Sequence, residues 1–150
     1  MKKILALGNI LLSNGGVTIY LADYLDKEFN ALGYEVIKCE NDIRCALSCI
    51  EEDDEIIIMD ASFTGDDSGR IHTMNLEDYE TEYFKNKAYS QSNIIFDYIF
   101  KKNKKIRGKV ILIEVCNMEL NDRLSKMVVE SFEKVALTVL EEVKKIENRD

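Results

Sequence analysis

Residues 5–20 read LALGNILLSNGGVTIY and contain the junction that decides the fold. Lys3 to Leu7 form an apolar stretch that predicts a short buried strand, and turns follow at Gly8-Asn9 and at Asn14-Gly15-Gly16. A helix is expected over Val17 to Asn30, because apolar residues recur there at helical spacing. The junction is therefore a strand that enters a helix through two glycine turns.

The rest of the chain continues this alternation. Strands are expected over Tyr34–Cys39, Ile56–Asp60 and Val110–Val115, with a shorter edge strand over Arg70–Asn75, and helices over Asp42–Ile50, Asn93–Phe100 and Ser125–Ile146. Residues 79–89 favour neither state. The pattern predicts an α/β fold with three layers, α/β/α, around a mostly parallel twisted sheet that allows one antiparallel edge strand. Neither a linker nor a repeat divides the chain, so residues 1–150 are expected to form a single domain.

Composition narrows the function. The net charge of −8 argues against a nucleic-acid partner, because phosphates call for clustered Lys and Arg. A helix that crosses a bilayer needs about 20 consecutive apolar residues, and no apolar run in this sequence approaches that length. We also expect no signal peptide, because the first residues do not follow its pattern. Four cysteines without a sign of export predict reduced thiols and a cytoplasmic location.

In a parallel sheet, ligands bind beyond the carboxyl ends of the strands. The first junction does not match a dinucleotide-binding loop, because Ile10 stands where the second glycine is required. A nucleotide P-loop is not indicated either, because the sequence has no Gly-Lys-Ser/Thr triplet. The glycines of this junction, Gly8, Gly15 and Gly16, either shape a binding site for another ligand or only allow the chain to turn. Asp60 ends the clearest buried strand, where a carboxylate either accepts bonds from neighbouring amides or binds a cation.

The other reactive side chains give weaker signals. Cys45 and Cys49 share a helical face and Cys39 is near in sequence, but buried thiols are a better interpretation than a metal site. His72 lies in the expected edge strand and is expected to be half exposed. A Ser–His–Asp or Cys–His pair centred on it stays open, although nothing in the sequence positions one.

The chain as a whole resembles the hydrogenase maturation proteases, cytoplasmic endopeptidases that remove a C-terminal extension from the large subunit of nickel–iron hydrogenase. The family begins with a strand and Gly-Asn-x-Leu-x-x-Asp-(Asp/Glu)-x-x-Gly, and this chain has GNILLSNGGVT over residues 8–18. Its third strand ends in Asp-Ala, like Asp60-Ala61. The family's Ser-x-His segment, which starts a helix with a later Asp, corresponds to Tyr89-Ser90-Gln91 followed by Asp97. The order of the elements also matches.

The resemblance implies a metal-contacting set at Gly15, Asp60 and Gln91, which engages nickel already inserted in the substrate. No tightly bound cofactor is implied. Only Asp60 keeps a carboxylate, Gln91 offers an amide in place of imidazole, and Asn14 replaces another carboxylate. The segment after the second strand, Glu40-Asn41-Asp42, departs from the family's glycine-rich pattern, and Glu40 or Asp42 is a candidate replacement carboxylate.

Two functions follow. In the first, the protein cleaves the C-terminal tail of a hydrogenase-like large-subunit precursor, with Asp60 as catalytic acid or ligand. In the second, it binds a peptide or protein without cutting it. In both, the substrate-binding candidates are Asn9, Asn14, Gly15, Glu40, Asn41 and Asp42. A third interpretation is an unrelated small-molecule site on the same scaffold. The first two expect Asp60 to project into an open groove.

Overall fold

The computed structural model describes residues 1–40, 42–51, 53–85, 107–117, 119, 121 and 123–148. Its strands are β1 (Lys2–Leu7), β2 (Tyr34–Glu40), β3 (Glu55–Ser62), β4 (Ile71–Asn75) and β5 (Arg107–Glu114). Its helices are the short 3-10 helix η1 (Ser13–Gly16), α1 (Val17–Tyr24), α2 (Asp26–Ala31), α3 (Ile43–Ser48), α4 (Leu76–Lys85) and α6 (Lys126–Glu147).

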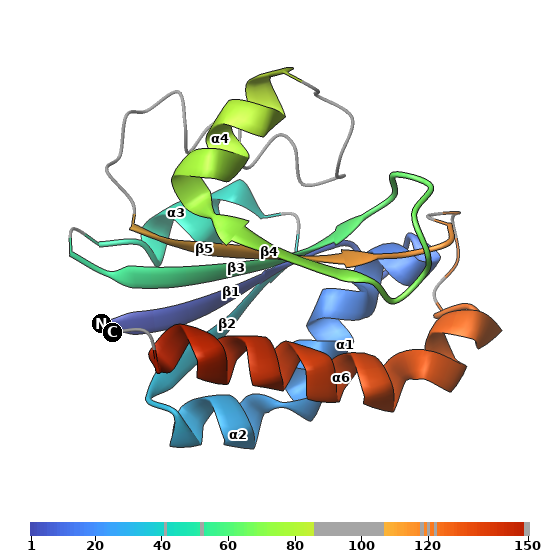
Figure 1. Ribbon diagram of the computed structural model, residues 1–150, viewed down its shortest axis with the longest axis horizontal. Helices are drawn as coiled ribbons and strands as arrows, with labels where there is room; N and C mark the ends of the chain where they lie inside the picture. Colours follow the sequence, from blue (N-terminus) through green and yellow to red (C-terminus); the bar gives the residue numbers. More distant parts are fainter. Residues whose placement is uncertain are drawn as a thin grey trace.

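The strands form one five-stranded sheet in the order β2-β1-β3-β5-β4. The first four in this order run parallel, and β4 pairs with β5 in the antiparallel direction. Helices α1, α2 and α6 cover one face, while α3 and α4 lie on the other (Figure 1). The predicted α/β/α fold and its antiparallel edge strand are therefore confirmed.

The apolar runs of β1, β3 and β5 explain this layering, because these inner strands have both faces covered. Alternate residues of β3 point to opposite sides, so Ile57 and Met59 enter the core with α1, α2 and α6, while Ile56 and Ile58 enter the core on the other face. All four are at most 1% exposed. The central strand is thus fixed by burial on both faces.

The expected helix over residues 17–30 is interrupted. Helix α1 ends at Tyr24 and α2 begins at Asp26, because Leu25 has φ −101° and ψ 8°, outside the helical range. Leu25 and Phe29 are nevertheless both buried in the same core. The apolar spacing continues across the break, which is why the sequence pattern predicted one helix.

The helix starts agree better with prediction. Ser125 precedes α6 and its hydroxyl oxygen accepts a hydrogen bond from the Val128 amide at 3.4 Å. Asp42 is the N-cap of α3, at the residue where the sequence predicted this helix to begin. The helix expected over residues 93–100 lies outside the described residues. Among the helices that are described, none combines the length and apolar character needed to cross a membrane.

A buried ion pair lies at the amino end of the sheet. The Lys3 ammonium donates to Asp54 at 2.6 Å and to the Cys49 carbonyl at 2.8 Å, and Asp54 also pairs with the chain's amino group at 2.8 Å. The hydrogen bond from Lys3 holds the pKa of Asp54 well below its usual value. This cluster ties β1 to the turn before β3 and lies at the end of the sheet opposite to the segments that carry the predicted site.

Candidate functional site

The carboxyl ends of four parallel strands meet at one edge of the sheet. The segments that the sequence singled out therefore lie at the same edge. Backbone hydrogen bonds join them: the Gly8 amide donates to the Glu40 carbonyl at 3.2 Å, and the Val115 amide donates to the Ser62 carbonyl at 2.9 Å. The expectation that Glu40 shares a rim with the opening bend is confirmed.

The bend over residues 8–16 is held by close backbone packing. A Cβ added to Gly8 would lie 2.5 Å from the Gly15 carbonyl oxygen, so no larger residue fits there without movement. That same oxygen accepts the Asn9 amide at 3.1 Å. The Asn9 side-chain oxygen accepts the Leu11 amide at 2.9 Å, which closes the turn. Asn9 thus supports the bend in addition to being a substrate-binding candidate.

Asn14 is fully buried and uses both ends of its amide. Its nitrogen donates to the Ser125 hydroxyl at 3.0 Å and lies 3.3 Å from the Cys116 sulfur. Its oxygen accepts the Ser125 amide at 2.8 Å. These bonds fasten the bend to the start of α6. The structure therefore gives Asn14 a structural role, and its predicted substrate contact stays a prediction.

Gly15 contributes backbone only. Its amide donates to the Leu12 carbonyl at 2.8 Å, within the short helix η1, and it is buried. An added Cβ would approach the Leu12 Cβ to 3.2 Å. At this position the chain has neither a side-chain ligand nor much room for one.

Asp60 lies in β3, two residues before the strand ends. It is 2% exposed, and one carboxylate oxygen accepts the Ala61 amide at 2.9 Å. The expectation that this side chain projects into an open groove is wrong in this structure, because so little of Asp60 is exposed. By the alternation along β3, Asp60 points to the same face of the sheet as Ile56 and Ile58. The carboxylate is placed at the predicted edge, but it is enclosed.

Asp60 has a row of neighbours across the sheet. Leu112 of β5 is its register partner and is also the partner of His72 of β4. Residues paired in this way point to the same face, so Asp60 and His72 flank Leu112 at a separation of about 9–10 Å between strands. The imidazole is therefore on the same face as the buried carboxylate.

The acidic candidates after β2 differ in their contacts. Glu40 is exposed and has a left-handed φ of 49°, which turns the chain at the end of the strand. Asp42 accepts the amides of Arg44 and Cys45 at 2.9 and 3.4 Å, and the Arg44 amide holds its pKa below the usual value. Asp42 is thus a helix cap, and Glu40 is the better placed of the two for an incoming chain.

Two candidates lie outside the described residues. Asn41 and Gln91 were predicted as substrate-binding and metal-contacting side chains, and their roles stay predictions. Among the described residues, no group of three or more His, Cys, Asp or Glu side chains is arranged to hold a metal ion.

A second buried carboxylate lies at this edge, at a residue that the sequence pattern did not single out. Glu114 ends β5, is 1% exposed, and accepts hydrogen bonds from the Ser62 hydroxyl at 2.7 Å and from three consecutive amides. The amides are those of Thr64 at 2.7 Å, Gly65 at 3.0 Å and Asp66 at 3.2 Å. The carboxylate therefore holds the turn after β3. The sequence feature that could have indicated this carboxylate is the apolar run of β5, which ends in Glu114.

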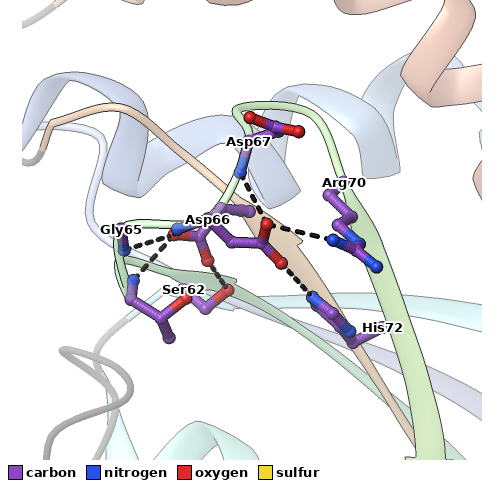
Figure 2. A network of polar contacts seen from close by, with 8 residues as sticks. Ser62, Gly65, Asp66, Asp67, Arg70 and His72 are labelled. Carbon is purple, nitrogen blue, oxygen red and sulfur yellow. Dashed lines mark hydrogen bonds and ion pairs between the residues drawn. The ribbon is translucent and has the colours of Figure 1, made fainter.

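The same turn carries an acidic residue that organises its neighbours. Figure 2 shows the Asp66 carboxylate in contact with both Arg70 and His72. The distances are 3.1 Å to the Arg70 guanidinium and 3.2 Å to the His72 Nε2. The Asp67 amide, followed by Arg70, holds the pKa of Asp66 below its usual value. The carboxylate that accompanies His72 is therefore Asp66, which the sequence pattern did not indicate.

The chain shares its fold with solved maturation proteases. Over 97% of its length it matches 97% of the NiFe hydrogenase maturation protease HybD from Thermococcus kodakarensis, with 22% identity and a TM-score of 0.74. It matches 93% of the hydrogenase maturating endopeptidase HybD from E. coli over 97% of its own length, with 17% identity and a TM-score of 0.74. Over 95% of its length it also matches 92% of the NiFe hydrogenase maturation protease HycI from Thermococcus kodakarensis KOD1, with 16% identity and a TM-score of 0.64.

The structural comparison supports the resemblance that the sequence motifs indicated. No protein-family model and no curated protein matches the chain. The likeness lies in the order and packing of the elements, and it extends over nearly the whole chain. The protein therefore has the fold of the nickel–iron hydrogenase maturation proteases.

Proposed function

We propose that the protein is a processing endopeptidase that cleaves the C-terminal extension of a hydrogenase-like large-subunit precursor after nickel insertion. The observation that carries this proposal is the carboxylate of Asp60 near the end of β3, at the edge where the opening bend and Glu40 meet. The shared fold supports the same class of protein. The nickel belongs to the substrate, and the protein holds no tightly bound cofactor of its own.

Peptide cleavage needs a polarised carbonyl and an activated water. Asp60 is the residue with the chemistry for this task, either as a ligand to the substrate's nickel or as the base that accepts a proton from water. One of its oxygens is oriented by the Ala61 amide at 2.9 Å. Because the side chain is 2% exposed, the incoming tail has to displace whatever covers it. Glu40 would then contact the tail from the neighbouring rim.

A second function is favoured by the contacts of the bend. Asn14 uses its amide to hold α6, and Gly15 has no side chain, so two positions that carry carboxylates in the family offer none here. A protein with these changes can recognise the precursor's tail and leave it intact. Binding without cleavage is therefore the alternative that the experiment has to separate.

The test uses a nickel-loaded precursor with its extension and the same precursor without nickel. If the first function holds, the wild-type protein shortens only the loaded precursor, and Asp60→Asn slows this at least about 100-fold. Asp26→Asn, an exposed carboxylate on α2, is the matched control and should cleave like the wild type. Circular dichroism verifies that each variant is folded.

Two other outcomes would speak against cleavage. Saturable binding of the loaded precursor with no shorter product, equal in wild type and Asp60→Asn, supports the binding module. If the folded protein neither binds nor cleaves a competent precursor, both the endopeptidase and the binding module are rejected.

A further inference from the structure

Two thiols lie in contact where β2 leads into α3. Cys39 is the next-to-last residue of β2 and is 2% exposed, and Cys45 lies in the first part of α3 and is half-buried. The Cys45 thiol donates to the Cys39 sulfur over 3.1 Å. Both cysteines are free. Side chains from two separate elements are therefore within reach of a covalent bond.

The backbone around the thiols fixes this approach. The Asp42 amide donates to the Cys39 carbonyl at 2.9 Å, and the Asp42 side chain caps α3 at the Cys45 amide. The left-handed φ of Glu40 turns the chain between them. The contact is thus set by a tight turn with its own hydrogen bonds.

We propose that Cys39 and Cys45 form a redox-active dithiol, which low-molecular-weight disulfides oxidise to an intramolecular disulfide. The Cys45 thiolate attacks one sulfur of the reagent, forms a mixed disulfide and releases one reagent thiolate. The Cys39 thiolate then attacks the Cys45 sulfur and displaces the second. The protein loses two protons and two electrons, and the reagent is reduced to two thiols.

The order of these steps follows from burial. Cys45 is the more accessible of the two, so it meets the reagent first. Burial, followed by the hydrogen bond from Cys45, raises the pKa of the Cys39 thiol, so Cys39 is not the first of the two to attack a reagent in solution. The second step is intramolecular, and the short sulfur–sulfur distance favours it.

The other two cysteines serve as comparisons, and one of them, Cys49, also neighbours Cys45. Cys49 follows α3 one turn after Cys45, and burial raises the pKa of its thiol too. Cys116 contacts the Asn14 side chain and lies 3.6 Å from the Ser125 hydroxyl, at the start of α6. Neither has another thiol within a described contact as short as that between Cys39 and Cys45.

The expected consequence is local. The disulfide closes a ring over residues 39–45, which includes Glu40 and Asp42, and fixes the start of α3 to the end of β2. The inference concerns the chain itself and does not rest on the proposed function.

The experiment treats the reduced full-length protein with glutathione disulfide, traps the remaining thiols at acidic pH, and maps the products by peptide mass spectrometry. In wild type, and in Cys49→Ser and Cys116→Ser, a Cys39–Cys45 disulfide is expected. In Cys39→Ser, the glutathione adduct at Cys45 should accumulate to a level at least about tenfold above wild type, because nothing resolves it. Cys45→Ser should lose both products.

Three results would overturn the inference. One is a wild-type disulfide mainly through Cys49 or Cys116. Another is a glutathione adduct at Cys45 that persists in wild type as it does in Cys39→Ser. The third is the absence of any intramolecular disulfide after full reaction of Cys45. If Cys39→Ser does not fold, the wild-type peptide map decides alone, because the bond is either present or absent there.

Discussion

Replacing Asn14 by Ala is expected to destabilise the whole fold, because this side chain connects the opening bend to α6. The change removes the bonds to the Ser125 hydroxyl at 3.0 Å and from the Ser125 amide at 2.8 Å. Each neutral hydrogen bond contributes about 1 kcal/mol, and a partner left without one costs about 1–3 kcal/mol. We therefore expect a loss of about 3 kcal/mol in the free energy of unfolding.

This loss converts into a measurable shift in melting temperature. An unfolding entropy of about 2.1 cal/mol/K per residue gives about 0.3 kcal/mol/K for 150 residues. A loss of 3 kcal/mol then lowers the melting temperature by about 10 °C. Differential scanning calorimetry of wild type and Asn14→Ala measures the shift directly.

The matched control is Asn30→Ala. Asn30 is exposed on α2, and its side chain bonds only to the Asp26 carbonyl, at 2.7 Å, among the contacts described. Its replacement should change the unfolding free energy by no more than about 0.5 kcal/mol. An Asn14→Ala variant that melts with the wild type but fails to bind a precursor would refute the structural role and favour direct contact with substrate.

Three further predictions concern the scaffold around the site. Gly8→Ala should lower the unfolding free energy in urea by more than about 2 kcal/mol, since its Cβ would meet a carbonyl oxygen at 2.5 Å; an unchanged midpoint would contradict this packing. Glu114→Ala should speed hydrogen exchange at amides 64–66, while equal rates would show that another group holds the turn. The pKa of Asp54 is lowered by folding, so its stabilising effect is present above the unfolded carboxyl value and is lost as the pH falls below about 4. Urea titrations at pH 5 and pH 3 should therefore show a smaller loss in Asp54→Asn than in wild type, and equal losses would argue against the pair.

The sequence could predict those features that depend on neighbouring residues. The apolar run of β3 marks a central strand, and Asp42 can be recognised as a helix cap from its position. The break at Leu25 could not be predicted, because both halves of the helix keep the same apolar spacing. The local sequence pattern is therefore sufficient to predict where helices and strands occur. It fails where tertiary packing interrupts a helix.

The site was harder to predict, since its contacts join distant residues. Asn14 is bonded to Ser125, 111 residues away, and Glu114 holds amides about 50 residues before it. No spacing rule relates such positions. The burial of Asp60 likewise depends on the layer over its face of the sheet, which the strand's own sequence does not describe.

These contacts also explain how the bend survives without its expected carboxylates. Thr18 is completely buried, and its hydroxyl donates to the Leu7 carbonyl at the end of β1. Asn14 ties the other end of the bend to α6, and Gly8 and Gly15 pack backbone against backbone. The bend is therefore held by bonds within the chain, with no metal needed to shape it.

It follows that the shared fold supports the class of protein and does not by itself decide whether the activity is kept. A bend that needs no ligand can keep its geometry after its ligand positions have changed, and the TM-score of 0.74 to two maturation proteases is compatible with either outcome. The question is decided at Asp60, whose carboxylate is the surviving acidic group of the implied set. Loss of cleavage in Asp60→Asn, with binding retained, would place the chemistry there; equal behaviour of the two proteins would leave this carboxylate as a buried acceptor for the Ala61 amide.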